Sequence, residues 1–291
     1  MTRSAPAALA ALVCSAALAG CGAASEAAQG TQGPAAATTT ATTSATAATP
    51  APTRTQDTGG AGRPLAGRTV VIDPGHNPGN FDHTREINEK VDIGTARKEC
   101  DTTGTSTNAT EGTPAYTEAA FTLDVSHRLR KLLEAGGATV VLTHDADRPY
   151  GPCIDERART GNKAKADAVV SVHADGSATG NRGFHVIVPA KVREGAADTG
   201  PIVAPSRRLG ERIVAGFRDA TGTSPANYLG GGTGLDVRSD LGGLNLSTVP
   251  KVFVECGNMR DPKDAALLTS GAWRQKAARG IADGIVTYLN G

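Results

Sequence analysis

Three short apolar runs, each followed by an ionisable residue, constrain the fold of this chain most strongly. They read TVVID at 69–73, AVVSV at 168–172 and VFV at 252–254, and β-branched runs of this kind predict buried strands. Two further runs, at 138–143 and 184–188, also predict strands. Helical patterns separate the strands, at 116–135, 155–166, 206–221 and 264–289. This alternation predicts an α/β fold with a mostly parallel, twisted sheet and helices on both faces.

The chain divides into three parts by composition. Residues 1–21 predict a signal peptide, because Arg3 precedes an apolar stretch too short to anchor in a bilayer. It closes on LAGC, which resembles the lipobox of bacterial lipoproteins, where Cys21 is lipidated; an ordinary secretory peptide would leave Cys21 incidental. Residues 22–62 are rich in Ala, Thr and Pro and predict a disordered linker. Residues 63–291 predict one globular domain.

These parts predict where the protein works. Either form of the signal exports the chain, and a lipid at Cys21 would attach it to the outer face of the cytoplasmic membrane. The linker would then let the domain reach into a cell wall. A formal net charge of +1 gives no reason to expect a nucleic-acid partner, and we expect a monomer.

The cysteines predict one disulfide in the folded domain. Cys100 and Cys153 lie in polar, loop-like contexts, whereas Cys256 ends an apolar strand. In an exported chain pairing is the default, so we expect a Cys100–Cys153 bond and a buried, reduced Cys256.

Ionisable side chains follow three of the predicted strands. His76, His173 and Glu255 come at or just beyond their carboxyl ends, and ligands bind at this edge of open α/β sheets. Glu118 lies in the first turn of a predicted helix, on the same face as Phe121, and an inward carboxylate usually needs a cationic partner. Two His and one Glu, with a fourth position left for water, form a known catalytic zinc pattern. The sequence therefore predicts a metal or acid–base site at this edge.

Four motifs in this order resemble one family. They are VVIDPGHNPGN, a Glu that opens the next helix, VVSVHADG, and LNLSTVPKVFVECGNMRDPKDAALL, and they span about 69–289. Together they are similar to the zinc-dependent N-acetylmuramoyl-L-alanine amidases of the peptidoglycan amidase type 3 family. The resemblance implies cleavage of the amide between N-acetylmuramic acid and L-alanine of the stem peptide, in peptidoglycan and muropeptides. It also implies one Zn²⁺ held by His76, Glu118 and His173, with Glu255 as the catalytic carboxylate that transfers protons.

Some residues depart from the family pattern, and others are assigned roles outside the four motifs. Asp175 stands where the family often has Asn, and His144 stands where it often has Arg. We interpret His144 as a neighbour of the site or a surface residue. The other histidines, 83, 127 and 185, are interpreted as structural or exposed. The Gly-rich segment 230–246 predicts a loop, in which GGGTG at 230–234 is interpreted as a flexible rim. Asn245 and Arg260 are candidate substrate contacts.

Other functions stay open from the sequence. One is a catalytically silent wall-binding or regulatory lipoprotein of the same fold, although the full set of four site residues argues against it. Another is a different zinc hydrolase, such as a peptidase or deacetylase, which the motif order disfavours. The polar segment 77–114 is long for a connection inside a domain. We hypothesise that it is a lid over the site, attached through Cys100 to the loop that carries Cys153; the alternative is a surface loop without this role.

Overall fold

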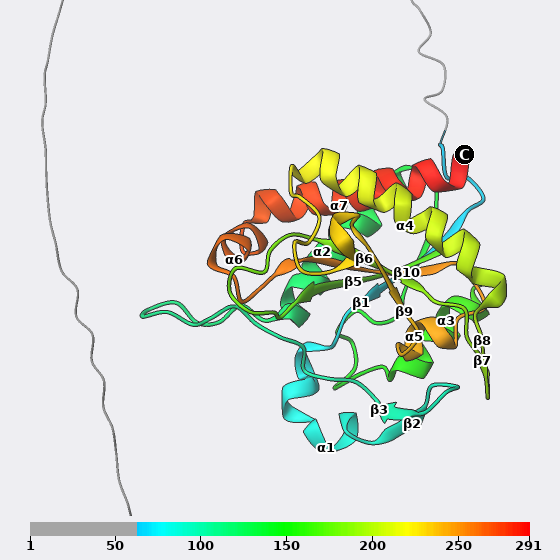
Figure 1. Ribbon diagram of the computed structural model, residues 1–291, viewed down its shortest axis with the longest axis horizontal. Coiled ribbons are helices and arrows are strands. Elements are labelled where there is room, and N and C mark those ends of the chain that lie inside the picture. Colours follow the sequence, from blue (N-terminus) through cyan, green and yellow to red (C-terminus); the bar gives the residue numbers. More distant parts are fainter. Residues whose placement is uncertain (1–62) are drawn as a thin grey trace, which may run out of the picture. The chain divides into compact units, whose positions relative to one another are not determined.

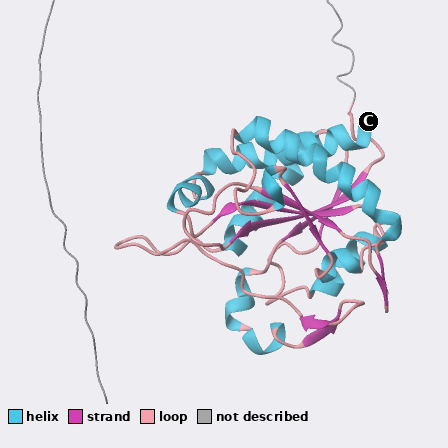
Figure 2. Ribbon diagram, in the orientation of Figure 1, coloured by secondary structure: helices cyan, strands magenta, loops and turns pink. Residues whose placement is uncertain are grey.

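The computed structural model describes residues 63–291. Figures 1 and 2 show a twisted central sheet with helices packed around it. The predicted signal peptide, Cys21 and the predicted linker lie outside the described residues. Within 63–291, no helix combines the length and the apolar character that crossing a membrane requires.

Six strands form the main sheet, in the spatial order β4-β1-β5-β10-β6-β9. The first four are mutually parallel, whereas β6 runs antiparallel to β10 and β9 runs parallel to β6. The prediction of a mostly parallel sheet is therefore confirmed. The strands are β1 Thr69–Pro74, β4 Thr139–Leu142, β5 Ala168–Asp175, β6 His185–Pro189, β9 Leu235–Arg238 and β10 Lys251–Asn258.

Helices cover both faces of the sheet, as predicted. On one face lie α2 Glu118–Ala135, α4 Gly200–Thr221 and α7 Gly271–Asn290, with α6 Pro262–Leu268 beside β10. On the other lie α3 Ile154–Lys163 and the short α5 Gly242–Asn245 (Figure 2). The prediction was wrong about the start of α4, which begins six residues before Ser206 and includes Pro205.

The alternation of side chains along the strands decides which residues meet at the site. Even-numbered residues of β1, β5 and β10, such as Val172 and Val254, enter the large core under α2, α4 and α7. Because successive strand residues point to opposite faces, the odd-numbered His173 and Glu255 lie on the other face. Cys256 belongs to the large core and is fully buried and unpaired, as predicted.

The segment 77–114 contains more local structure than its polar composition suggested. It holds η1 Pro78–Asp82, α1 Thr84–Ile87 and a small hairpin of β2 Lys90–Asp92 and β3 Arg97–Glu99. The predicted Cys100–Cys153 disulfide is present and joins the segment to the residue that precedes α3.

The Gly-rich segment 230–246 was expected to be a loop throughout, and this interpretation was wrong. It contains the short helix η2 Gly230–Gly232, the edge strand β9 and α5. A further small hairpin pairs β7 Arg193–Glu194 with β8 Ala197–Asp198.

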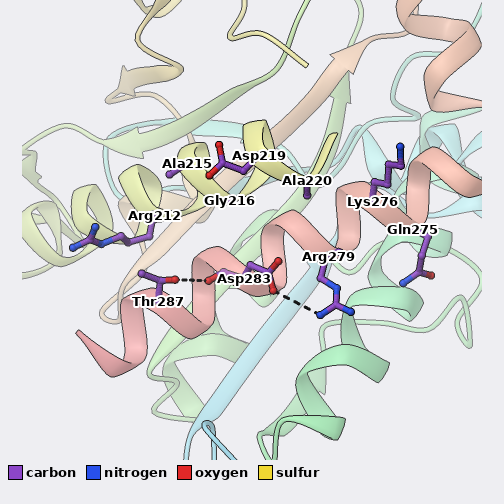
Figure 3. A pocket seen from close by; sticks show the side chains of 10 residues that line it. All are labelled: Arg212, Ala215, Gly216, Asp219, Ala220, Gln275, Lys276, Arg279, Asp283 and Thr287. Atoms are coloured by element: carbon purple, nitrogen blue, oxygen red, sulfur yellow. Dashed lines mark hydrogen bonds and ion pairs between the residues drawn. The ribbon is translucent and has the colours of Figure 1, made fainter. Parts of the chain in front are cut away.

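Helices α4 and α7 pack closely because glycines face each other at their crossing. A Cβ atom at Gly280 would lie 2.6 Å from the Cα of Phe217, and one at Gly284 would lie 2.6 Å from the Cα of Ile213. A groove of about 660 Å³ runs along this helix pair. In it, the Asp283 carboxylate pairs with Arg279, and the Asp283 backbone carbonyl accepts a hydrogen bond from the Thr287 hydroxyl (Figure 3). None of the predicted site residues lines this groove.

We expect Gly280→Ala to destabilise the domain. Overpacking costs about 1–3 kcal/mol, against a gain in helix propensity of about 1 kcal/mol. We expect the cost to dominate, because the added methyl meets backbone atoms of α4 and no side-chain rotation relieves the clash. Denaturant unfolding measures the change. Gly271→Ala in the same helix is the matched control, because its nearest neighbour would be a flexible side chain at 3.7 Å. Equal stability of the two variants would contradict the expectation.

Candidate metal centre

Three potential ligand atoms converge at the carboxyl edge of the sheet. The Oε1 atom of Glu118 lies 3.1 Å from Nε2 of His76 and 3.0 Å from Nδ1 of His173. The imidazole rings meet edge to face, with their centroids 5.1 Å apart. His76 follows β1, His173 lies in β5 and Glu118 opens α2, so the predicted donor set is brought together from three separate elements.

Glu118 is aimed inward by the helix that it opens. Thr117 is the N-cap, and its hydroxyl accepts a hydrogen bond from the backbone N–H of Ala120. The Glu118 side chain is buried on the same face as Phe121. Its second oxygen, Oε2, accepts a hydrogen bond of 2.9 Å from the backbone of Thr105. This contact leaves Oε1 as the oxygen that faces the two imidazoles.

His76 is held in a tight backbone turn. Its φ angle is +61°, in the left-handed region that non-glycine residues rarely adopt. The preceding Gly75 has no room for a side chain, because a Cβ there would lie 2.3 Å from the His173 ring. A Cβ at Gly104 would likewise lie 2.7 Å from the His76 ring. Two glycines thus let the backbone close around the imidazoles.

The charges around the three residues favour a cation. Burial alone would lower the pKa of His76, but the carboxylates of Glu118 and Asp101 outweigh it and raise that pKa to about 10. Burial would raise the pKa of Glu118, yet the His76 and His173 imidazoles hold that pKa well below its usual range. The site therefore attracts positive charge between its donor atoms.

The donor set fits zinc in chemistry and in spacing. Zinc takes imidazole nitrogen and carboxylate oxygen at about 2.0–2.2 Å, which places tetrahedral ligand atoms about 3.3 Å apart. The two separations between Glu118 and the imidazoles, 3.0 and 3.1 Å, are close to this value, and all three ligand atoms lie within 4.8 Å of one another. Each imidazole also has a partner on its other nitrogen: Nδ1 of His76 faces the Thr102 carbonyl at 3.1 Å, and Nε2 of His173 faces the Ser171 hydroxyl at 3.1 Å. Such partners are typical of metal-binding histidines.

Glu255 lies beside this donor set on the neighbouring strand. It pairs in register with His173 across β10 and β5, so both side chains project from the same face. Its Oε2 atom is buried and has no hydrogen-bond partner within 63–291. Burial, together with the charges of Glu118 and Asp175, raises the pKa of Glu255 well above its usual range. A cation held by the three ligands would favour the charged form and lower that pKa again.

The two candidate substrate contacts lie elsewhere. Asn245 is 1% exposed, and its amide donates to the carbonyl of Ser239 at 2.9 Å, so in this structure it ties α5 to the preceding loop. Arg260 is exposed and donates to the side chain of Asn108 at 2.9 Å. Neither residue lines the cavity beside the imidazoles.

The remaining residues that the sequence singled out have structural partners. Nε2 of His144 is 2.9 Å from the carbonyl of Pro74, which makes His144 a buried neighbour of the His76 turn. The carboxylate of Asp175 accepts a hydrogen bond of 2.7 Å from the hydroxyl of Tyr228. His127 pairs with Asp145 at the surface.

A cavity of about 260 Å³ opens beside the imidazoles. Lys98 and Glu99 of the 77–114 segment form one wall, Gly242 and Gly243 form another, and Phe253 stacks on the His173 ring at 5.3 Å. The 77–114 segment is thus part of the site itself. The lid hypothesis stays a prediction. Its test must spare Asp101, Thr102 and Thr105, which contact His76 or Glu118.

Sequence reasoning missed a group of buried charges beneath the site. Asp73, Asp101, Arg157 and Lys251 have side chains no more than 6% exposed and are joined by three ion pairs of 2.8–3.1 Å. We call these four residues the buried ionic cluster. Asp73 is the residue that could have indicated the buried ionic cluster. It is a carboxylate that directly follows the apolar run of its strand, as Glu255 does in its own strand.

The fold and the site together define a single α/β domain with a His-Glu-His donor set and an adjacent carboxylate at the carboxyl edge of its sheet. The family described as N-acetylmuramoyl-L-alanine amidase matches residues 70–287. A curated N-acetylmuramoyl-L-alanine amidase of Mycobacterium tuberculosis is 40% identical over 226 residues, which cover 77% of this chain and 88% of that protein. This chain therefore belongs to the N-acetylmuramoyl-L-alanine amidase family.

Solved structures agree with this assignment. The amidase Ami1 from Mycobacterium smegmatis matches with a TM-score of 0.69 and 39% identity, over 77% of this chain and 98% of that chain. The apo form of Ami1 from Mycobacterium abscessus matches with a TM-score of 0.69 and 40% identity, over 77% and 100%. Amidase LytC of Bacillus subtilis is 27% identical, and the match covers only 36% of its length.

Proposed function

We propose that this chain hydrolyses the amide bond between N-acetylmuramic acid and L-alanine of the peptidoglycan stem peptide, with one Zn²⁺ held by His76, Glu118 and His173. The observation that carries the proposal is the convergence of these three donor atoms beside the carboxylate of Glu255. Membership of the amidase family supports the choice of substrate.

The zinc site and Glu255 have different roles in the proposed reaction. When bound, zinc supplies Lewis-acid activation of a water molecule and of the scissile carbonyl. Glu255 accepts a proton from the attacking water and delivers it to the nitrogen of L-alanine, so the amide C–N bond breaks and a carboxylate and a free amine form. Cys256 takes no part, because it faces the core on the opposite side of β10.

The decisive experiment is digestion of purified peptidoglycan by the zinc-loaded protein. We expect release of stem peptides with new L-alanine amino ends, detected by amino-group labelling and mass spectrometry. Glycan strands without new reducing ends would show that sugar bonds stay intact. If wild-type protein and Glu255→Gln released equally little peptide, a silent wall-binding role would replace the enzyme. Cleavage at a different peptide bond or of an acetyl group would instead indicate a peptidase or deacetylase.

We also propose that the protein is exported and acts at the outer face of the cytoplasmic membrane or in the cell wall, with Cys21 as a lipid anchor and 22–62 as a tether. The support is the LAGC sequence at 18–21 and the composition of the linker. We expect the wild-type chain in the membrane fraction and Cys21→Ala in the soluble or secreted fraction. Recovery of both in the same fraction would leave the secretory-peptide alternative.

A further inference from the structure

The buried ionic cluster is connected to both histidines of the candidate metal centre, to His173 through Ser171 and to His76 through Asp101 and Arg157. Its members come from β1, the 77–114 segment, α3 and β10, and they carry two negative and two positive charges. Charges this deeply buried persist only when each is paired and hydrogen-bonded.

Arg157 is the centre of the cluster, and each of its five N–H groups has an acceptor. Two of them reach carboxylates: Nη1 donates to Asp73 and Nη2 donates to Asp101, both at 2.8 Å. The other three reach backbone carbonyls, of Pro152 at 2.8 Å, Pro74 at 2.6 Å and His76 at 3.1 Å. The guanidinium therefore donates to backbone carbonyls before and at His76, in the turn where His76 has its left-handed conformation. Only the planar fork of arginine can meet this set of acceptors.

A chain of hydrogen bonds leads from Arg157 to His173. Asp73, held by Arg157 and by Lys251, accepts a hydrogen bond of 2.9 Å from the hydroxyl of Ser171. Because that hydroxyl has one proton, its oxygen accepts from Nε2–H of His173 at 3.1 Å. This fixes the tautomer of His173, so its Nδ1 lone pair faces Glu118 and the metal position.

A second chain leads from Arg157 to His76. Asp101 is held by Arg157 and accepts hydrogen bonds from the side chain of Asn80 at 3.1 Å and the backbone of Thr102 at 2.8 Å. The carbonyl of Thr102 faces Nδ1 of His76 at 3.1 Å, with a carboxylate oxygen of Asp101 at 3.6 Å. Nδ1 of His76 therefore carries the proton, and Nε2 is left to face the metal position.

We propose that Arg157 is a positioning residue that orients both histidine ligands at once, through Asp73 and Ser171 for His173 and through Asp101 and the 74–76 turn for His76. This inference rests on the proposed zinc site. Helix α3 contributes no ligand. Through Arg157 it would hold His76, which follows β1, and His173, which lies in β5, in one geometry. Replacing Arg157 should therefore lower the affinity for zinc, in addition to any effect on the stability of the fold.

Zinc affinity of purified variants tests the inference, measured by competition with a chromophoric chelator. Arg157→Lys keeps the charge but loses the fork, and we expect its zinc dissociation constant to rise by about 10–100-fold. Arg182→Lys is the matched control: Arg182 pairs with Asp264 at 2.9 Å and contacts none of the three ligands. We expect Arg182→Lys to bind zinc as wild type does, even where its unfolding midpoint falls.

Ser171→Ala makes the test independent of folding defects, because it removes only the hydroxyl between Asp73 and His173. We expect weaker zinc binding and an altered visible absorption spectrum of the Co²⁺-substituted protein, with native circular dichroism. Wild-type zinc affinity in Arg157→Lys and Ser171→Ala would overturn the inference, and Arg157 would then serve stability alone. A wild-type protein that binds no zinc would instead overturn the proposed function.

Discussion

Replacing Glu255 by Gln is expected to lower kcat on peptidoglycan by about 10²–10⁴-fold, the usual contribution of a general acid–base group. The substitution keeps the size of the side chain and removes its ability to accept a proton. Zinc affinity should stay at the wild-type level, because Glu255 pairs in register with His173 but is not one of the three converging ligands. Release of stem peptides measures the rate, and chelator competition measures zinc.

Glu211→Gln is the matched control for this prediction. It makes the same chemical change on α4, where Glu211 is an exposed partner of Arg207, and should leave the rate unchanged. A Glu255→Gln protein that kept wild-type turnover would contradict the assignment of proton transfer to Glu255. One that lost zinc together with activity would show that Glu255 is a fourth ligand.

Removing the carboxylate of Glu118 should abolish both zinc binding and activity. Loss of a partner of a ligand typically costs 10–100-fold in metal affinity, so loss of the ligand itself in Glu118→Ala should cost more than about 100-fold. The two imidazoles also lose the charge that balances a cation, since Oε1 of Glu118 lies within 3.1 Å of both. Chelator competition and peptidoglycan digestion measure the two losses.

Two comparisons make the Glu118 result specific. Glu134→Ala removes a carboxylate at the far end of the same helix, where it pairs with Arg130 at the surface, and should leave zinc binding intact. Stripping zinc from the wild-type protein should reproduce the inactivity of Glu118→Ala, and added zinc should restore only the wild type. Full activity of Glu118→Ala, or of stripped protein, would contradict a metal-dependent reaction.

The candidate site could be predicted closely because its signals are local. His76 and His173 occur at or beyond the ends of apolar strands, and parallel strands bring such ends to one edge. The face of Glu118 followed from its spacing to Phe121 on one helix. Glu255 and Cys256 were expected to point to opposite faces of the sheet, because side chains alternate along a strand. Each inference needed only residues within a few positions of the ligand.

The buried ionic cluster escaped prediction because its contacts are not local. Arg157 lies in a polar helix whose sequence resembles a solvent-exposed face, and its partner Asp73 is 84 residues away. Strand β9 was hidden in a Gly-rich stretch, since its pairing with β6 is decided by the sheet edge and not by its own composition. Asn245 is polar by type but buried by the packing of α5.

The sequence by itself determined the class of fold, the four residues of the candidate centre and the pairing of Cys100 with Cys153. Apolar periodicity and strand ends indicate the fold and the edge at which the site lies, and helix spacing indicates the face of Glu118. The polar contexts of Cys100 and Cys153 indicate their pairing. Only the tertiary structure decided which nitrogen of each histidine faces the metal position and which residues hold it there. Those choices depend on hydrogen bonds from Arg157, Ser171 and Thr102. Such bonds form only when segments far apart in sequence are packed together and water is excluded from their polar groups.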